Sequence, residues 1–283
     1  MKLLATMVAL LSVCVSSFAG EKSVELKSPF YRPHYNARKA NTAKPHDVGD
    51  AVIVNAASYE PGISPGGLAT IFGDDLTTVT GVVYAYANPL PDELADVQVF
   101  VSGIPAPIYG IAYAGGQDQI SIQVPYDAPT GHNAAEIQVV DNGTTVADFF
   151  TDSFTEDPGI FTYDDNIAIA EASDFSLIGL DNPAIPGEAL VLYVTGLGPL
   201  SSDPPLVDGY GSPTSAPFAT TVDPFEVILD NEECDVFFSG LAPGFVGLYQ
   251  INFYVPADAA SGNLQIYIQS TYANSGIAML PVQ

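Results

Sequence analysis

The sequence predicts an all-β protein built from two similar sandwich-like units, and three observations support this. From residue 51 onward, short apolar or alternating runs are separated by clusters of Gly, Pro, Asn and Asp, the pattern of many short strands joined by turns. Helical spacing of apolar residues is nowhere sustained, because Pro and Gly interrupt every window long enough to show it. A strand-and-turn motif also occurs twice along the chain.

The repeated motif lies at residues 114–131 (AGGQDQISIQVPYDAPTG) and 241–262 (LAPGFVGLYQINFYVPADAASG). The two openings, Pro65-Gly66-Gly67 and Pro186-Gly187-Glu188, are 121 positions apart, whereas the two Val-Pro pairs at 124 and 255 are 131 positions apart. The second unit therefore contains ten extra residues. We place them in the Pro-, Gly- and Ser-rich loop 198–221, and loops of this length are usually functional or mobile.

In the first unit, a hairpin is predicted at Asp141-Asn142-Gly143, because Asn-Gly tolerates the positive φ angles of a type I′ turn. The predicted strands of this unit cover residues 68–72, 79–87, 97–102, 106–113, 119–124, 134–140 and 144–150.

In the second unit, strands are predicted at residues 189–195, 225–229, 234–239, 249–255, 264–269 and 276–282. The junction between the units falls near residues 156–161, which gives domains at 51–160 and 161–283. Each domain is long enough to bury most of its surface without disulfides.

The first nineteen residues are typical of a signal peptide: Lys2 precedes an apolar run, and Ser17-Phe18-Ala19 forms a small-x-small cleavage site. We therefore expect a secreted protein, extracellular or at the cell surface, with the periplasm as a further location. The alternative is a lipoprotein lipidated on Cys14, although Val13 stands where a small residue is expected. No later run approaches the roughly 20 apolar residues of a transmembrane helix, so no transmembrane segment is expected.

Residues 20–50 are basic, contain Pro33 and Pro45, and show no sustained periodicity, which predicts a flexible arm. The alternative is that Val24, Leu26 and the Phe30-Tyr31 pair let this segment dock as a strand on a sheet edge, in this molecule or a neighbouring one.

Charge is segregated along the chain. All seven Lys and Arg residues precede residue 45, whereas only Glu21 and Glu25 of the 33 acids do, so residues 45–283 carry 31 carboxylates and no fixed cation. Such a body repels nucleic acid and anionic membranes, because both are bound through Lys and Arg. It also repels itself unless cations or a basic partner screen it.

Segments spread over nearly all of residues 52–283 match one known family, in the family's order. They are residues 54–59, 61–62, 65–68, 70–73, 89–91, 103–107, 158–162, 182–184, 186–188, 195–199 and 240–250. On these segments the chain resembles the acidobacterial Solibacter-type uncharacterised C-terminal domain family. The resemblance implies paired immunoglobulin-like sandwiches related to the IPT/TIG type, with no enzymatic activity attached. The complete lack of Lys and Arg in residues 45–283 is unusual for the family.

Catalytic groups are sparse, and we expect no enzyme. Only three histidines occur; His34 and His46 lie in the arm, and His132 aligns with Asn263 of the second unit, which indicates a turn role. The sequence has no Gly-x-Ser-x-Gly elbow, phosphate loop, zinc motif or cysteine cluster. Paired acids such as Asp74-Asp75 fall in predicted turns, where a glycosidase would need them held across a cleft.

Calcium is the candidate cofactor, because it is a hard cation that takes six to eight oxygen ligands. Neither candidate group fits the EF-hand spacing, and solvated acidic turns are the alternative reading. One group lies at the domain junction and the other in a hairpin: Glu156, Asp157, Asp164 and Asp165, and Asp230, Glu232 and Glu233 with Asp235 beyond them.

Three tyrosines are candidate binding residues. Tyr84 and Tyr86 share one face of a predicted strand, and Tyr210 lies in the long loop; exposed tyrosines favour binding surfaces. A separate prediction concerns Cys234, which alternates with Val236 and Phe238 on one strand face. It is expected to be a small core residue, with an intermolecular disulfide or reactive thiol as the alternative.

These observations favour a non-enzymatic extracellular or cell-surface module for adhesion or structure, whose partners would be other surface proteins or polysaccharide. The first alternative is a self-assembling, filament-type subunit whose basic arm docks on the acidic body of the next copy. A weaker alternative is a polysaccharide-binding or accessory domain. The arm residues predicted to make the contacts are Lys22, Lys27, Phe30, Tyr31, Arg32, Arg38, Lys39 and Lys44.

Overall fold

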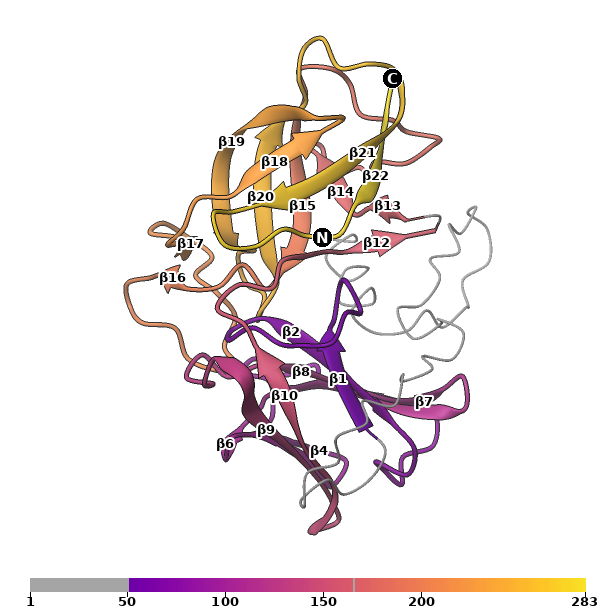
Figure 1. The fold of residues 1–283 in the computed structure, drawn as a ribbon, viewed down its shortest axis with the longest axis vertical. Coiled ribbons are helices and arrows are strands. Elements are labelled where there is room, and N and C mark those ends of the chain that lie inside the picture. Colours follow the sequence, from indigo (N-terminus) through magenta and orange to yellow (C-terminus); the bar gives the residue numbers. More distant parts are fainter. Residues whose placement is uncertain (1–50, 165) are drawn as a thin grey trace.

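The computed structural model describes residues 51–164 and 166–283, in which all regular secondary structure is β-strand. The predicted signal peptide, basic arm and lipidation site lie outside these residues. Two β-rich bodies follow each other along the long axis of the molecule (Figure 1). The predicted fold class is confirmed: the protein consists of two tandem immunoglobulin-like antiparallel β-sandwiches. Within the described part of the chain, no helix has the length and apolar character needed to cross a membrane.

The first sandwich packs a five-stranded sheet, ordered β1-β2-β8-β7-β3, against a second sheet ordered β10-β9-β5-β4, with β6 paired to β5. Asn142 and Gly143 have φ angles of 49° and 75°, as the predicted type I′ hairpin between β9 and β10 requires. The strands are β1 Ala51–Asn55, β2 Leu68–Gly73, β3 Val82–Tyr84, β4 Glu93–Leu94, β5 Val97–Val101, β6 Ile104–Pro105, β7 Ile108–Ala114, β8 Gln117–Gln123, β9 Gly131–Asp141 and β10 Thr144–Ser153.

The second sandwich is one continuous sheet ordered β11-β15-β20-β19-β18-β21-β22-β13-β12, folded over itself. Its strands are antiparallel except for a parallel contact between β13 and β22. The fold occurs along β19, whose first residues pair with β18 and whose remaining residues pair with β20. The strands are β11 Gly159–Ile160, β12 Thr162–Tyr163, β13 Ile167–Ala168, β14 Ala170–Ala172, β15 Ala189–Thr195, β16 Leu200–Ser201, β17 Thr220–Thr221, β18 Glu226–Leu229, β19 Glu232–Leu241, β20 Tyr249–Tyr254, β21 Gly262–Gln269 and β22 Ala278–Val282.

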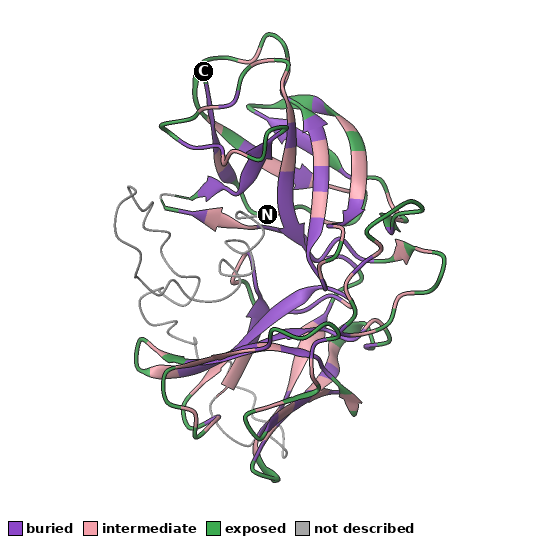
Figure 2. Ribbon diagram, turned by 180° about the vertical axis from the view of Figure 1, so that it is seen from behind, coloured by how far each residue is buried: buried purple, intermediate pink, exposed green. Residues whose placement is uncertain are grey.

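Each sandwich has its own apolar core, formed by alternate residues of the facing strands. In β5, for example, Val97, Val99 and Val101 are buried while the residues between them are half-buried, the period of two expected for a sheet with one core face. Figure 2 shows buried residues along the facing strands of both bodies and also between the bodies.

The predicted duplication is visible in backbone hydrogen bonds. In the first copy, Gly66 N donates to Val124 O and Val124 N donates to Gly67 O, each at 2.9 Å. In the second copy, Gly187 N donates to Val255 O and Val255 N donates to Glu188 O, again at 2.9 Å. The Val-Pro motif therefore ends its strand against the Pro-Gly turn in the same way in both copies.

The two sandwiches are joined by a buried apolar cluster that contains Ala56 and Leu68 of the first and Tyr193 and Leu248 of the second. Polar groups at the joint are paired across it. The Thr195 hydroxyl accepts from Leu68 N at 2.8 Å and donates to Gly247 O at 3.1 Å. Asp157 N donates to Gly196 O of the second domain at 2.8 Å, and Asp157 O accepts from the Asn55 amide at 2.6 Å. The joint therefore resembles a small core and not a free linker.

The long loop 198–221 lies against the first sandwich, although it belongs to the second. Its Gly209 N donates to Gln123 Oε1 at 2.7 Å, and Gly209 O accepts from Leu90 N at 2.8 Å. Asp208 Oδ1 accepts from Tyr126 N at 2.9 Å. This loop is thus used as a strap between the domains.

We expect Thr195→Val to lower the free energy of unfolding by about 1–3 kcal/mol, because Leu68 N–H and Gly247 C=O would be left buried without their partner. The matched control is Thr145→Val on the exposed side of β10, which should change stability by less than about 0.5 kcal/mol. Urea unfolding of both variants measures the difference. Equal losses in the two variants would contradict the role of the Thr195 hydroxyl.

Candidate functional site

The three tyrosines predicted to bind a partner lie on segments that the fold brings together. Tyr84 and Tyr86 form an edge-on pair with ring centroids 6.2 Å apart, and Tyr86 is 84% exposed. Tyr210, 52% exposed, stands between Gly209 and Gly211, and Gly211 N donates to Asn88 Oδ1 at 3.1 Å. We call Tyr84, Tyr86 and Tyr210 the tyrosine surface; it is built from both domains.

Carboxylates border the loop that carries Tyr210. Burial raises the pKa of Asp208, the hydrogen bond from Tyr126 N partly offsets this, and the nearby charges of Asp127 and Asp92 raise it further. No Lys or Arg occurs anywhere after residue 44, so these acids have no fixed countercharge in the body. A partner that brings positive charge would therefore be attracted here.

A cavity of about 470 Å³ opens beside the strap, within the size range of small-ligand sites. The Tyr126 hydroxyl is buried; burial and the Asp208 charge raise its pKa, and a hydrogen bond with the Gln123 side chain partly offsets this. Apolar and hydroxyl-bearing side chains from both domains make the wall, which suits a neutral group. The lining residues are Pro65, Tyr126, Ala128, Thr130, Thr155, Gly198, Pro199, Leu200, Ser202, Pro205 and Leu206.

The junction acids predicted to bind calcium contact different partners. The buried Glu156 accepts a short hydrogen bond from the Ser270 hydroxyl and shares a side-chain hydrogen bond with Asp223. Burial raises its pKa, as does the neighbouring Asp223. Asp157 instead contacts the Asn55 amide at 3.2 Å. Asp164 lies in a turn, and Asp165 is outside the described residues.

The hairpin acids are also spread apart. Asp230 and Asn231 form the turn, with φ angles of 50° and 71°, and the exposed Glu232 and Glu233 are adjacent in β19. Adjacent strand residues point to opposite faces, so these two carboxylates do not converge. Residues 51–164 and 166–283 contain no group of three or more His, Cys, Asp or Glu residues placed to hold a metal. Calcium binding stays a prediction.

His132 lies at the exposed start of β9. Its Nδ1 is 2.7 Å from Asp152 Oδ1, and its Nε2 is 3.0 Å from the Asn133 amide. Asp152 also accepts from Asn133 N at 2.7 Å. The contacts of His132 with Asp152 and Asn133 therefore stabilise the turn before β9.

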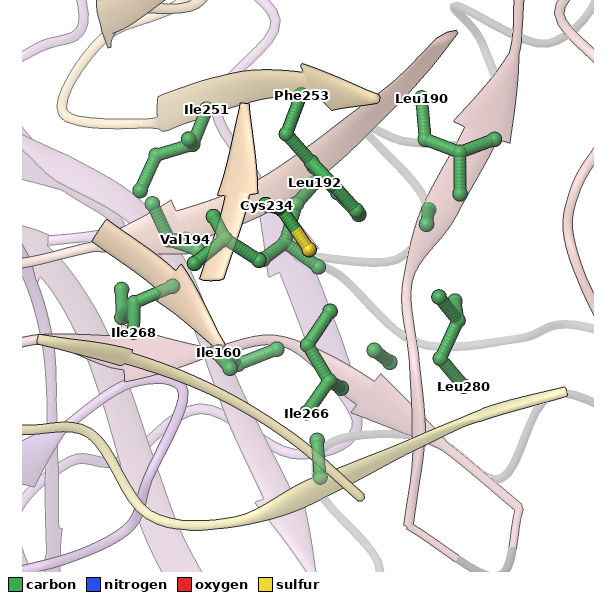
Figure 3. Close-up of a cluster of buried hydrophobic side chains, with 14 of the residues drawn as sticks. Ile160, Leu190, Leu192, Val194, Cys234, Ile251, Phe253, Ile266, Ile268 and Leu280 are labelled. Atoms are coloured by element: carbon green, nitrogen blue, oxygen red, sulfur yellow. The ribbon is translucent and has the colours of Figure 1, made fainter. Parts of the chain in front are cut away.

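Cys234 belongs to the core of the second sandwich. Figure 3 shows its sulfur among apolar side chains that include Leu192 and Ile266. Burial raises the thiol pKa to about 12, which keeps the group protonated and unreactive at neutral pH. The predicted packing role is observed for Cys234.

The prediction that Phe238 shares the face of Cys234 is wrong. A β-bulge between Val236 and Phe238 shifts the register with β20, and Phe238 comes to lie opposite Asn252. Asn252 is half-buried between the core residues Ile251 and Phe253, so Phe238 points away from the core. Strict alternation fails here because a bulge inserts one extra residue.

As a result, aromatic side chains that sequence reasoning missed gather on the outer face of β19 and β20. Phe237 and Tyr254 are 4.8 Å apart between ring centroids, and Phe238 meets Phe218 edge-on at 6.2 Å. We call Phe218, Phe237, Phe238 and Tyr254 the β19 aromatic face. Only the doubled Phe237-Phe238 pair could have hinted at it.

No family model matches the sequence, and no curated protein matches it. Among solved structures, the I9–I11 tandem from titin is similar at 12% identity and a TM-score of 0.21, over 84% of this chain and 65% of that chain. Domains 4–9 of the surface layer protein SbsC are similar at 12% identity and a TM-score of 0.24, over 84% of this chain and 31% of that chain. The Yersinia pseudotuberculosis adhesin InvE is similar at 10% identity and a TM-score of 0.22, over 84% of this chain and 61% of that chain.

The chain spans less than two thirds of each of these structures. Similarity at these identities and TM-scores carries no inference about activity, ligands or partners. The class of protein, a tandem immunoglobulin-like module, is defined by the sheets of the chain itself.

We expect the midpoint of thermal unfolding to rise when the pH is lowered from 7.5 towards 5. Burial raises the pKa of Glu156, Asp157, Glu171 and Asp208 above their ordinary values. A raised folded-state pKa contributes stability that is complete below the unfolded pKa near 4 and is lost as the pH rises through the folded pKa.

Calorimetry across this pH range tests the expectation. Glu156→Gln, which fixes a neutral side chain, should weaken the pH dependence, and the exposed Glu232→Gln serves as its control. If the midpoint of thermal unfolding falls as the pH is lowered, groups other than these buried carboxylates determine the pH dependence of stability.

Proposed function

We propose that the protein is a secreted, non-enzymatic module for adhesion or structure, extracellular or at the cell surface. The observation that carries the proposal is the joint between the sandwiches. It holds Tyr84 and Tyr86 of one domain beside the loop of Tyr210 from the other, so a partner meets one preorganised surface. Tyrosine supplies large contact area at a low cost in conformational entropy.

The resemblance to the Solibacter-type family agrees with this proposal, since it implies no activity. The partners that fit are other surface proteins or polysaccharide. A neutral cavity beside the strap and exposed tyrosines would suit an uncharged or cationic partner, whereas the acidic body disfavours an anionic one.

We expect the double variant Tyr86→Ser/Tyr210→Ser to bind its surface partner about tenfold or more weakly, because exposed tyrosines are frequent anchors of interfaces. Both side chains are largely exposed, so folding should be retained. Biolayer interferometry against a panel of cell-surface proteins and polysaccharides makes the measurement.

The matched control is Tyr272→Ser, which removes a tyrosine from the loop after β21 whose exposed fraction, 75%, lies between those of Tyr86 and Tyr210. Equal binding by the double variant and the wild type would reject the tyrosine surface. Turnover of a glycan in the same panel would reject the non-enzymatic proposal.

A second candidate function is self-assembly through residues 20–44, and charge segregation favours it. This segment carries six Lys or Arg residues and two Glu, a net charge of +4, against the 31 uncompensated carboxylates of residues 45–283. Complementary charge accelerates and orients association. A head-to-tail contact between such a segment and the next body can continue into a filament.

We expect residues 20–283 to assemble at physiological salt, and residues 50–283 to stay monomeric, when both are measured by light scattering after size exclusion. A variant of residues 20–283 with its six Lys and Arg residues changed to Gln should behave like residues 50–283. If all three forms are monomers, the assembly candidate fails, and the search turns to an outside ligand.

A further inference from the structure

The duplication allows the β19 aromatic face to be compared residue by residue with the first domain. With Val124 equivalent to Val255, β8 matches β20 and β7 matches β19. Ile108 lies opposite Ile122 as Val236 lies opposite Phe253, and each pair is followed by a bulge. The bulged residue is Tyr109 in the first copy and Phe237 in the second.

In the first copy, this face is covered by the second domain. The Tyr109 hydroxyl donates to Val246 O, and its ring packs against the interdomain cluster. Gln123, which occupies the position of Tyr254, is fully buried and accepts from Gly209 N at 2.7 Å. The bulge of the first domain therefore presents its aromatic side chain to an interface.

In the second copy, the same face is open among the described residues. Phe237 is 51% exposed and Tyr254 43% exposed, although their rings are in contact. Phe237 and Tyr254 occupy the positions of Tyr109 and Gln123, which in the first copy contact the second domain. Exposed apolar clusters of this kind mark interaction sites.

The surroundings of the β19 aromatic face are acidic. Asp235 lies directly opposite Tyr254, and Glu233, two residues earlier in β19, lies on the same side of the strand. Aromatic rings flanked by carboxylates attract a cation from two sources, since the ring face and the carboxylate both favour positive charge. Arg is the side chain that best serves both.

We propose that the β19 aromatic face is the docking site for residues 20–44 of a second copy of this chain. Body-to-body contact alone would bring two strongly acidic surfaces together. Residues 20–44 instead combine the only Lys and Arg residues left after residue 20 with Phe30, Tyr31 and Tyr35. This inference rests on the proposed self-assembly and adds to it the surface that receives the segment.

The test uses residues 20–283 with a photo-crosslinking benzoylphenylalanine in place of Phe237, in a mixture of isotopically light and heavy chains. We expect crosslinks between light and heavy chains that map to residues 20–44. Crosslinks only within one chain would overturn the proposal, because the segment would then cover its own body. Crosslinks to another part of the body would overturn it as well.

A variant series gives an independent measurement. Phe237→Thr/Tyr254→Thr should weaken assembly of residues 20–283 about tenfold or more, as should Arg32→Gln/Arg38→Gln, which leaves the face untouched. The control Tyr113→Thr removes an exposed strand tyrosine from the first domain and should assemble like the wild type. Circular dichroism verifies that each variant is folded.

The outcomes separate this inference from the function on which it rests. If Phe237→Thr/Tyr254→Thr assembles like the wild type while the arginine variant does not, assembly through the segment stands and this docking site is rejected. If the wild type itself does not assemble, both are rejected.

Discussion

The lack of any fixed cation after residue 44 constrains the rest of the structure. With 31 carboxylates and no Lys or Arg between residues 45 and 283, no Lys or Arg ion pair can form within this part of the chain, and its cohesion comes from apolar cores and hydrogen bonds. At the domain joint, the Thr195 hydroxyl, the Gln123 amide and backbone groups form neutral hydrogen bonds, and one carboxylate, Asp208, accepts from Tyr126 N. Buried neutral hydrogen bonds of this kind avoid the desolvation cost of buried charge.

The same constraint determines which partners the body can accept. Each carboxylate kept in a turn or on an outer face adds to a negative field with no internal compensation. Where burial acts on a carboxylate, as at Glu156 and Asp208, it raises the pKa and favours the neutral form. A positively charged segment bound to the body would reduce this negative potential. The carboxylates of Asp235 and Glu233 lie beside the β19 aromatic face, so such a segment could contact the carboxylates and the aromatic rings together.

Local features of the chain were predictable from sequence, whereas long-range ones were not. The Asn142-Gly143 hairpin, the β15 strand and the Val-Pro strand ends follow from residue preferences and period-two alternation. The docking of Gly209 against Gln123 depends on contacts between residues 86 positions apart, which no window of sequence contains. The prediction for Phe238 failed because alternation assumes an unbroken register, and a bulge breaks the register without a sequence signature.

That bulge also shows how duplication can produce a surface. Both copies keep the irregularity at the same position, so its geometry belongs to the shared fold. In the first copy the following residue is Gly110, over which the Tyr84 ring lies, and Tyr109 reaches the second domain. In the second copy the following residue is Phe238, so two adjacent aromatic rings leave the same face. A bulge leaves one residue unpaired, bends the strand locally and redirects the side chains beside it. One inherited irregularity therefore supports an internal joint in one domain and an exposed aromatic surface in the other.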